Sequence, residues 1–120
     1  MNLKNKTLLT LGLLLGAGTG CLSAAEVTDW YPVTTENRPF VRWWWLGSAV
    51  DPEGLTYNLE EFARQGLGGV EITPIYGVKG NEANDISYLS PKWMNMLGHT
   101  IAEGKRLGLQ IDMNNGTGWP

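Results

Sequence analysis

The sequence has few of the residues on which redox, metal and nucleic-acid sites depend. It contains one cysteine, Cys21, and one histidine, His99. An intrachain disulfide is therefore excluded, and a zinc site is not expected because His99 has no Cys or His companions. Lys and Arg form no run beyond the amino terminus, and the net charge is −3. We expect no nucleic-acid partner, since a phosphate-binding face needs a basic patch.

The amino terminus has the pattern of an export signal, and its apolar run is too short to span a membrane. Lys4 and Lys6 precede this apolar core, which covers residues 8–15. Ser23-Ala24-Ala25 then suits a signal-peptidase cut before Glu26. The pattern predicts that the mature chain is exported and keeps no transmembrane segment after cleavage.

Residues 1–25 are thus predicted to be a signal peptide. The mature protein is then expected in the bacterial periplasm, on the cell surface or outside the cell. Cys21 leaves an alternative open, because Gly20-Cys21 could be a lipoprotein attachment site with a lipid anchor at Cys21. Gly18 stands where such sites usually carry Leu, which argues for simple cleavage.

Tryptophan and glycine are in excess, with 6 Trp and 16 Gly in the chain. Trp43-Trp44-Trp45 favours an extended strand, since bulky aromatics fit a pleated surface better than a helix interior. Gly47 then ends the strand, and Asp51-Pro52 has the cap and the proline that begin a helix. Tryptophan excess without basic charge favours sugars or apolar ligands, although core packing is the default role of any one Trp.

The rest of the chain repeats this strand-to-helix pattern. Ser90-Pro91 repeats the helix start, and the helix exits at Gly66 and Gly108 match each other. The predicted elements are a lead-in segment at 26–40, strands at 41–45, 69–73 and 109–113, helices at 52–65 and from 90 to 108, and a loop at 74–89.

The order β-α-β-α-β predicts an α/β fold with parallel strands and right-handed crossovers. The helical stripes should be Leu55, Leu59, Phe62 and Ala63 in the first helix, and Trp93, Leu97, Ile101 and Gly104 in the second. Three strands cannot close a barrel. We therefore expect residues 41–120 to be the truncated amino-terminal part of a larger domain, of the (β/α) TIM-like barrel kind.

Alternation along the strands predicts one polar sheet face. If Val70 and Ile72 pack on helices, Glu71 must point the other way, and Asp112 and Asn114 do so in the third strand. A doubly wound sheet would have apolar residues on both faces, so a polar barrel interior explains the pattern better.

Arg42, Trp44, Glu71 and Asp112 could line this interior together. Two interpretations remain open for the charged members: a buried structural ion-pair network, or contact with a ligand. Both require them to be close together, because buried charges are costly unless paired. Alternate members of the triple Trp must face helices, so at most two can stack on a sugar.

Four motifs occur together in one order: residues 38–45 (RPFVRWWW), 51–55 (DPEGL), 68–77 (GGVEITPIYG) and 112–120 (DMNNGTGWP). In this order they resemble the opening of glycoside hydrolase family 106, which comprises large secreted bacterial α-L-rhamnosidases. The resemblance covers about residues 37–120. Leu46 departs from the pattern, since relatives have a proline there.

The resemblance implies that residues 41–120 begin a (β/α)-barrel catalytic domain, which β-rich domains follow. It also implies calcium-assisted, inverting hydrolysis of rhamnosides from plant pectin. The partner would be a rhamnose-containing oligo- or polysaccharide. Inverting hydrolysis needs an acid and a base, and we expect both beyond residue 120, so no residue here is predicted to be catalytic. The positions expected to face substrate are Trp44, Glu71, Asp112, Asn114 and Trp119.

Two other functions remain open from the sequence. A non-catalytic carbohydrate-binding segment would use the Trp cluster without an acid and a base, although such modules are usually β-sandwiches. An inactive truncated remnant is the other possibility, and we expect the 120-residue chain alone to be inactive.

Overall fold

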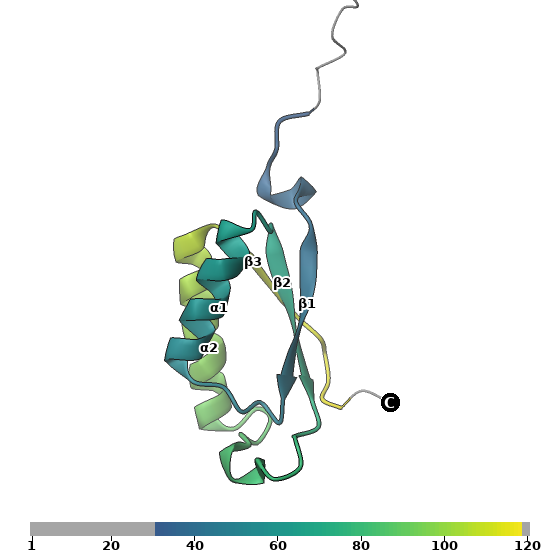
Figure 1. The fold of residues 1–120 in the computed structure, drawn as a ribbon, viewed down its shortest axis with the longest axis vertical. Coiled ribbons are helices and arrows are strands. Elements are labelled where there is room, and N and C mark those ends of the chain that lie inside the picture. The colour runs from purple at the N-terminus through teal and green to yellow at the C-terminus, as the bar shows by residue number, and fades with distance from the viewer. Residues whose placement is uncertain (1–30, 119–120) are drawn as a thin grey trace, which may run out of the picture. The chain divides into compact units, whose positions relative to one another are not determined.

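The computed structural model describes residues 31–118, and residues from Pro32 onward belong to one compact unit. This unit is an α/β domain with a parallel sheet of three strands in the order β1-β2-β3, and two α-helices (Figure 1). The elements are β1 (Phe40–Leu46), α1 (Pro52–Arg64), β2 (Gly69–Ile75), α2 (Pro91–Leu107) and β3 (Gln110–Met113), with 3₁₀ turns at Thr35–Asn37 and Glu82–Asn84. The predicted β-α-β-α-β order is confirmed.

Both helices begin at the predicted caps. The Asp51 carboxylate accepts a hydrogen bond from the Gly54 N–H at 2.8 Å, and Ser90 Oγ accepts one from the Trp93 N–H at 3.2 Å. A proline follows each cap at the first helical position, where its missing donor costs nothing. At the other ends, Gly108 caps α2 with a φ of 70°.

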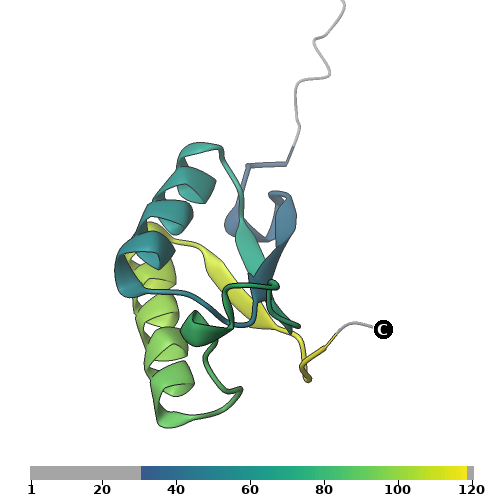
Figure 2. The same ribbon diagram turned by 60° about the horizontal axis from the view of Figure 1, so that its bottom comes forward.

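The sheet lies against both helices on one of its faces only (Figure 1, Figure 2). Trp45, Leu55, Ile72 and Trp93 are buried in one core cluster between the two layers. Trp43 packs edge-on against Phe62 of α1, with ring centroids 5.5 Å apart. A doubly wound sheet would carry helices on both faces, so the described strands and helices have the single-sided arrangement that the strand alternation predicted.

Strand β2 is longer than predicted. It continues through Thr73 and Pro74 to Ile75, whereas the sequence suggested an end at Thr73. The pairing of β2 with β3 reaches only Ile72↔Met113, so beyond that point β2 pairs with β1 alone. A proline is tolerated at such an edge because no second ladder needs its N–H.

One predicted core position in α2 is wrong. Ile101 is 51% exposed, whereas Thr100 is fully buried. The Thr100 hydroxyl donates a 2.8 Å hydrogen bond to the Met96 carbonyl, which satisfies its polar atom inside the core. The spacing of hydrophobic residues does not reveal a buried threonine whose hydroxyl bonds its own helix. The prediction from spacing therefore placed the neighbouring Ile101 in the core instead.

The predicted signal peptide at residues 1–25 and the alternative anchor at Cys21 lie outside the described residues. Within residues 31–118, no helix is long and apolar enough to cross a membrane.

Candidate functional site

The sheet face that the helices leave uncovered carries a row of charged residues. The strand register pairs Arg42 with Glu71 and Glu71 with Asp112, so the three lie side by side across β1, β2 and β3. Arg42 Nε donates to Glu71 Oε2 at 3.1 Å. The predicted proximity is therefore confirmed, but the two paired side chains are 42% and 36% exposed. The pair is thus partly exposed within residues 31–118, and both interpretations of the charged residues stay open for the whole protein.

Trp44 lies on the same face and is 40% exposed. The Arg42 guanidinium carbon is 5.8 Å from the centroid of its ring, within the range of a cation–π contact. Trp45 is buried, and Trp43 packs against the core cluster on the helix side. Only the middle tryptophan can thus offer its ring to a ligand on the uncovered face.

Asp112 and Asn114 continue this face at the third strand. Asp112 is exposed, and Gln110 Nε2 is 3.4 Å from both of its carboxylate oxygens. Asn114 follows β3 directly, is half-buried, and donates its backbone N–H to the Ile72 carbonyl at 2.9 Å. The fifth predicted substrate-facing residue, Trp119, lies outside the described residues.

The carboxyl ends of the strands hold a feature that sequence reasoning missed. A cavity of about 250 Å³ lies there, lined among others by Gly47 after β1, Gly77 after β2 and Thr117 after β3. Asp85, from the loop predicted at 74–89, also lines it. The available signal was a glycine within two residues of the end of each of two strands, because such positions allow close approach of another group.

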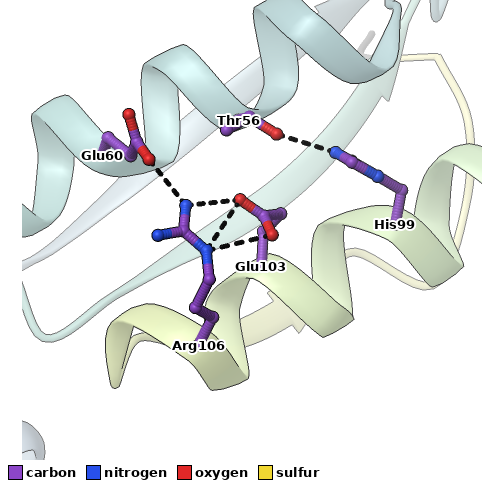
Figure 3. A network of polar contacts seen from close by, with 5 residues as sticks. All are labelled: Thr56, Glu60, His99, Glu103 and Arg106. Carbon is purple, nitrogen blue, oxygen red and sulfur yellow. Dashed lines mark hydrogen bonds and ion pairs between the residues drawn. The ribbon is translucent and has the colours of Figure 1, made fainter.

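A second polar cluster joins the two helices away from this face (Figure 3). Arg106 of α2 binds Glu60 of α1 at 2.7 Å and Glu103 of its own helix at 2.6 Å. The hydrogen bond from Arg106 holds the pKa of the Glu103 carboxyl below its ordinary value. Thr56 Oγ1 and His99 Nε2 are 2.9 Å apart beside it. These contacts link α1 to α2, so we interpret the cluster as a structural contact that stabilises the packing of the two helices.

A metal centre has little support in the described part of the chain. Between residues 31 and 118, no group of three or more His, Cys, Asp or Glu side chains is placed to hold a metal ion. Glu71 and Asp112 are neighbours, but one Glu71 oxygen is already bonded to Arg42.

Comparison with known proteins agrees with the fold. A protein of Formosa agariphila named "Putative beta-glucuronidase" is 30% identical over 79 residues, which cover 64% of this chain and 6% of that protein. The solved rhamnosidase from Novosphingobium sp. PP1Y superimposes with a TM-score of 0.61 at 23% identity, over 74% of this chain and 8% of its own. The chain therefore spans less than a tenth of either protein.

The family assignment rests on a match over most of the chain. The sequence model of glycoside hydrolase family 106, described as alpha-L-rhamnosidase, matches residues 32–120. This range contains the whole described sheet, both helices and all five residues predicted to face substrate. The chain belongs to glycoside hydrolase family 106, the alpha-L-rhamnosidase family.

Proposed function

We propose that this chain is the amino-terminal part of an exported bacterial glycoside hydrolase that cleaves α-L-rhamnosides, with pectic oligosaccharides as the natural substrate class. Its sheet would be the first three strands of a (β/α) barrel. The observation that carries the proposal is the uncovered sheet face. A single-sided sheet leaves one face for a barrel interior, and here that face bears Arg42, Glu71 and Asp112 in one row.

The row has the chemistry of a sugar-binding surface. Carboxylates accept hydrogen bonds from sugar hydroxyls, and an exposed indole can stack on the apolar face of a sugar ring. In this arrangement Asp112 accepts from the sugar directly. Arg42 fixes one oxygen of Glu71, so that the other oxygen is held in a defined direction. Trp44 supplies the aromatic surface beside them.

The chemical step is assigned to carboxylates beyond residue 120. An inverting mechanism uses a carboxylic acid to protonate the leaving oxygen and a carboxylate to activate water on the opposite side of the ring. The residues of this chain would bind and orient the sugar for that step. They would thereby contribute to the rate through positioning.

Calcium remains a proposal for the whole protein. The ion takes six to eight oxygen ligands, and the described residues bring together no group of three acidic or histidine side chains that could begin such a shell. We therefore derive no step of the reaction through calcium.

Substrate preference tests the proposal on the full-length protein. Purified protein is offered an aryl α-L-rhamnoside, a rhamnose-containing pectic oligosaccharide and an aryl β-D-glucuronide, the last because of the name of the Formosa relative. We expect turnover of the rhamnosides, with the first-formed rhamnose in the inverted β configuration by proton NMR. Turnover of the glucuronide alone would reject the rhamnosidase proposal, and α-rhamnose as the first product would reject inversion.

Export is tested separately by amino-terminal sequencing of the mature protein. A free Glu26 or Ala25 would support signal-peptidase cleavage. A blocked amino terminus carrying lipid on Cys21 would show that the anchored alternative applies.

A further inference from the structure

The Asp85 carboxylate lies against two glycines, Gly47 and Gly77, at the carboxyl ends of the strands. A Cβ atom built on Gly47 would overlap Asp85 Oδ1, and one built on Gly77 would overlap Asp85 Oδ2. Each carboxylate oxygen therefore lies where any larger residue would place its side chain. Two positions in different loops have to be glycine for the same carboxylate to fit.

The backbone around Asp85 holds this arrangement in place. Ile86 donates its N–H to the Gly47 carbonyl at 2.9 Å, which ties the residue after Asp85 to the loop that follows β1. Gly47 in turn donates to the carbonyls of Ile75 and Tyr76 at the end of β2. Among the described residues, no side chain or backbone group donates a hydrogen bond to the Asp85 carboxylate. Its acceptor sites thus remain available to a ligand.

The surroundings of Asp85 combine polar and aromatic groups. The cavity of about 250 Å³ is also lined by Ser87, Tyr88 and Thr117. It shares Ile75 and Tyr76 with an apolar hollow of about 340 Å³ that is lined by Trp44 and Leu46 as well. Drug-sized ligands need pockets of roughly 300–1,000 Å³, so the polar cavity suits a single sugar ring, with the apolar hollow beside it for a neighbouring unit.

We propose that Asp85 is a sugar-binding residue whose carboxylate, held by Gly47 and Gly77, accepts hydrogen bonds from the hydroxyls of one monosaccharide unit at the carboxyl ends of β1, β2 and β3. The inference rests on the proposed function for the identity of the sugar. It adds a residue, and a binding position beside the row on the sheet face. Ligands of parallel α/β folds bind at this end of the strands, which agrees with the placement.

Two substitutions in the full-length protein test the position of the carboxylate and its charge separately. Asp85→Asn keeps the shape and removes the charge. Gly77→Ala keeps Asp85 but pushes its carboxylate away, and it introduces no backbone strain because Gly77 is outside the left-handed region. Gly98→Ala is the matched control, since a Cβ atom there would meet nothing within 4 Å.

The readout is binding of monosaccharides, measured by titration calorimetry with L-rhamnose first and then with a panel of other pyranoses. We expect Asp85→Asn and Gly77→Ala to weaken binding by roughly ten- to a hundredfold, the range for losing one hydrogen bond to a charged group. Gly98→Ala should bind as the unsubstituted protein does, and all variants should melt within a few degrees of it. If Asp85→Asn fails to fold, Gly77→Ala decides.

The outcome separates this inference from the proposed function. If the unsubstituted protein cleaves no rhamnoside but binds another pyranose, and both variants lose that binding, the Asp85 site stands while the rhamnosidase proposal falls. Normal sugar binding by folded Gly77→Ala and Asp85→Asn would overturn the inference even if rhamnosides are cleaved. Failure of the unsubstituted protein to bind any monosaccharide would overturn it as well.

Discussion

Ser48 has a backbone conformation that few residues other than glycine adopt. Its φ is 50°, and it is buried directly after Gly47, where the chain leaves β1. The Ser48 hydroxyl accepts a 3.0 Å hydrogen bond from Nε1 of the buried Trp93 in α2. A side chain in this strained region persists only where its surroundings hold it, and here the bond to Trp93 does so.

Ser48→Ala should therefore destabilise the domain. The change leaves the buried Trp93 N–H without an acceptor, which costs about 1–3 kcal/mol. Thermal unfolding of the full-length protein measures the effect, with Ser87→Ala as the control because Ser87 is exposed. Equal melting temperatures for the two variants would show that the bond to Trp93 contributes nothing to stability.

Glu103 should titrate below the ordinary Glu pKa of about 4.3, because the Arg106 hydrogen bond favours its charged form. A carboxylate with a lowered pKa in the folded state stabilises the fold above its unfolded pKa, and this contribution is lost as the pH falls through the folded pKa. The acid limb of the stability profile, below about pH 4, should therefore respond to this pair. Carbon-13 NMR titration of labelled Glu side chains would show it, and Arg106→Gln should return the pKa towards the ordinary value. An unchanged titration in Arg106→Gln would contradict the assignment.

At the scale of elements, most of the helices and strands could be predicted from hydrophobic alternation and from the helix caps. Asp51-Pro52 and Ser90-Pro91 begin helices as predicted, and alternation correctly set the half-buried Glu71 apart from the buried Val70 and Ile72. The end of β2 was not predictable, because the tolerance of Pro74 depends on where β3 stops pairing. Where β3 stops pairing depends on residues far apart in the chain, so the local sequence around Pro74 does not reveal it.

Two glycines in α2 differ in their surroundings, so substitutions at them distinguish the effect of helix propensity on stability from the effect of packing. Gly98 is exposed, and a Cβ atom there would meet nothing within 4 Å. Gly104 is buried, and a Cβ atom there would overlap the Ile111 side chain of β3. Glycine thus has a packing reason at one position and none at the other.

Gly98→Ala should stabilise the protein by about 0.5–1 kcal/mol, because alanine loses less backbone entropy in a helix. Gly104→Ala should destabilise it by about 1–3 kcal/mol, since the added methyl group forces α2 away from β3. The melting temperatures of the two variants in the full-length protein should shift in opposite directions. A stabilising Gly104→Ala would contradict the packing of α2 on β3.

At the scale of the whole molecule, the uncovered sheet face is both the candidate site and a liability. It exposes Phe40, Trp44 and Leu46 by 40%, 40% and 43% beside the charged row. Exposed apolar area of this kind marks an interaction surface. We propose that the remaining strands of a (β/α) barrel bring the rest of the protein around it.

The 120-residue chain expressed alone should accordingly be poorly folded and without hydrolase activity. Within residues 31–118 the third strand has an open edge and the helices cover one face of the sheet, so this part lacks the burial that a stable domain needs. Calorimetric melting and a rhamnoside assay test this together. A sharp cooperative melt combined with rhamnoside turnover by the isolated chain would contradict the prediction.

The site itself was only partly accessible from the sequence. The face of Trp44, Glu71 and Asp112 follows from strand alternation, which is local. The position of Asp85 against Gly47 and Gly77 does not follow from local sequence. It arises because the loop around Asp85 returns to the ends of β1 and β2. In the sequence, Asp85 is a carboxylate in a polar loop, which is typical of a solvated residue. Only the structure shows that it contacts the two glycines.

The central claim is that the uncovered sheet face serves the substrate, and Glu71→Gln tests it most directly. This substitution in the full-length protein keeps the shape of the side chain and removes its charge. If Glu71 contacts the sugar in the transition state, kcat/KM for a rhamnoside should fall about a hundredfold, or about 3 kcal/mol, while the melting temperature barely moves. A melting temperature several degrees lower with near-normal turnover would show instead that Glu71 serves only to neutralise Arg42.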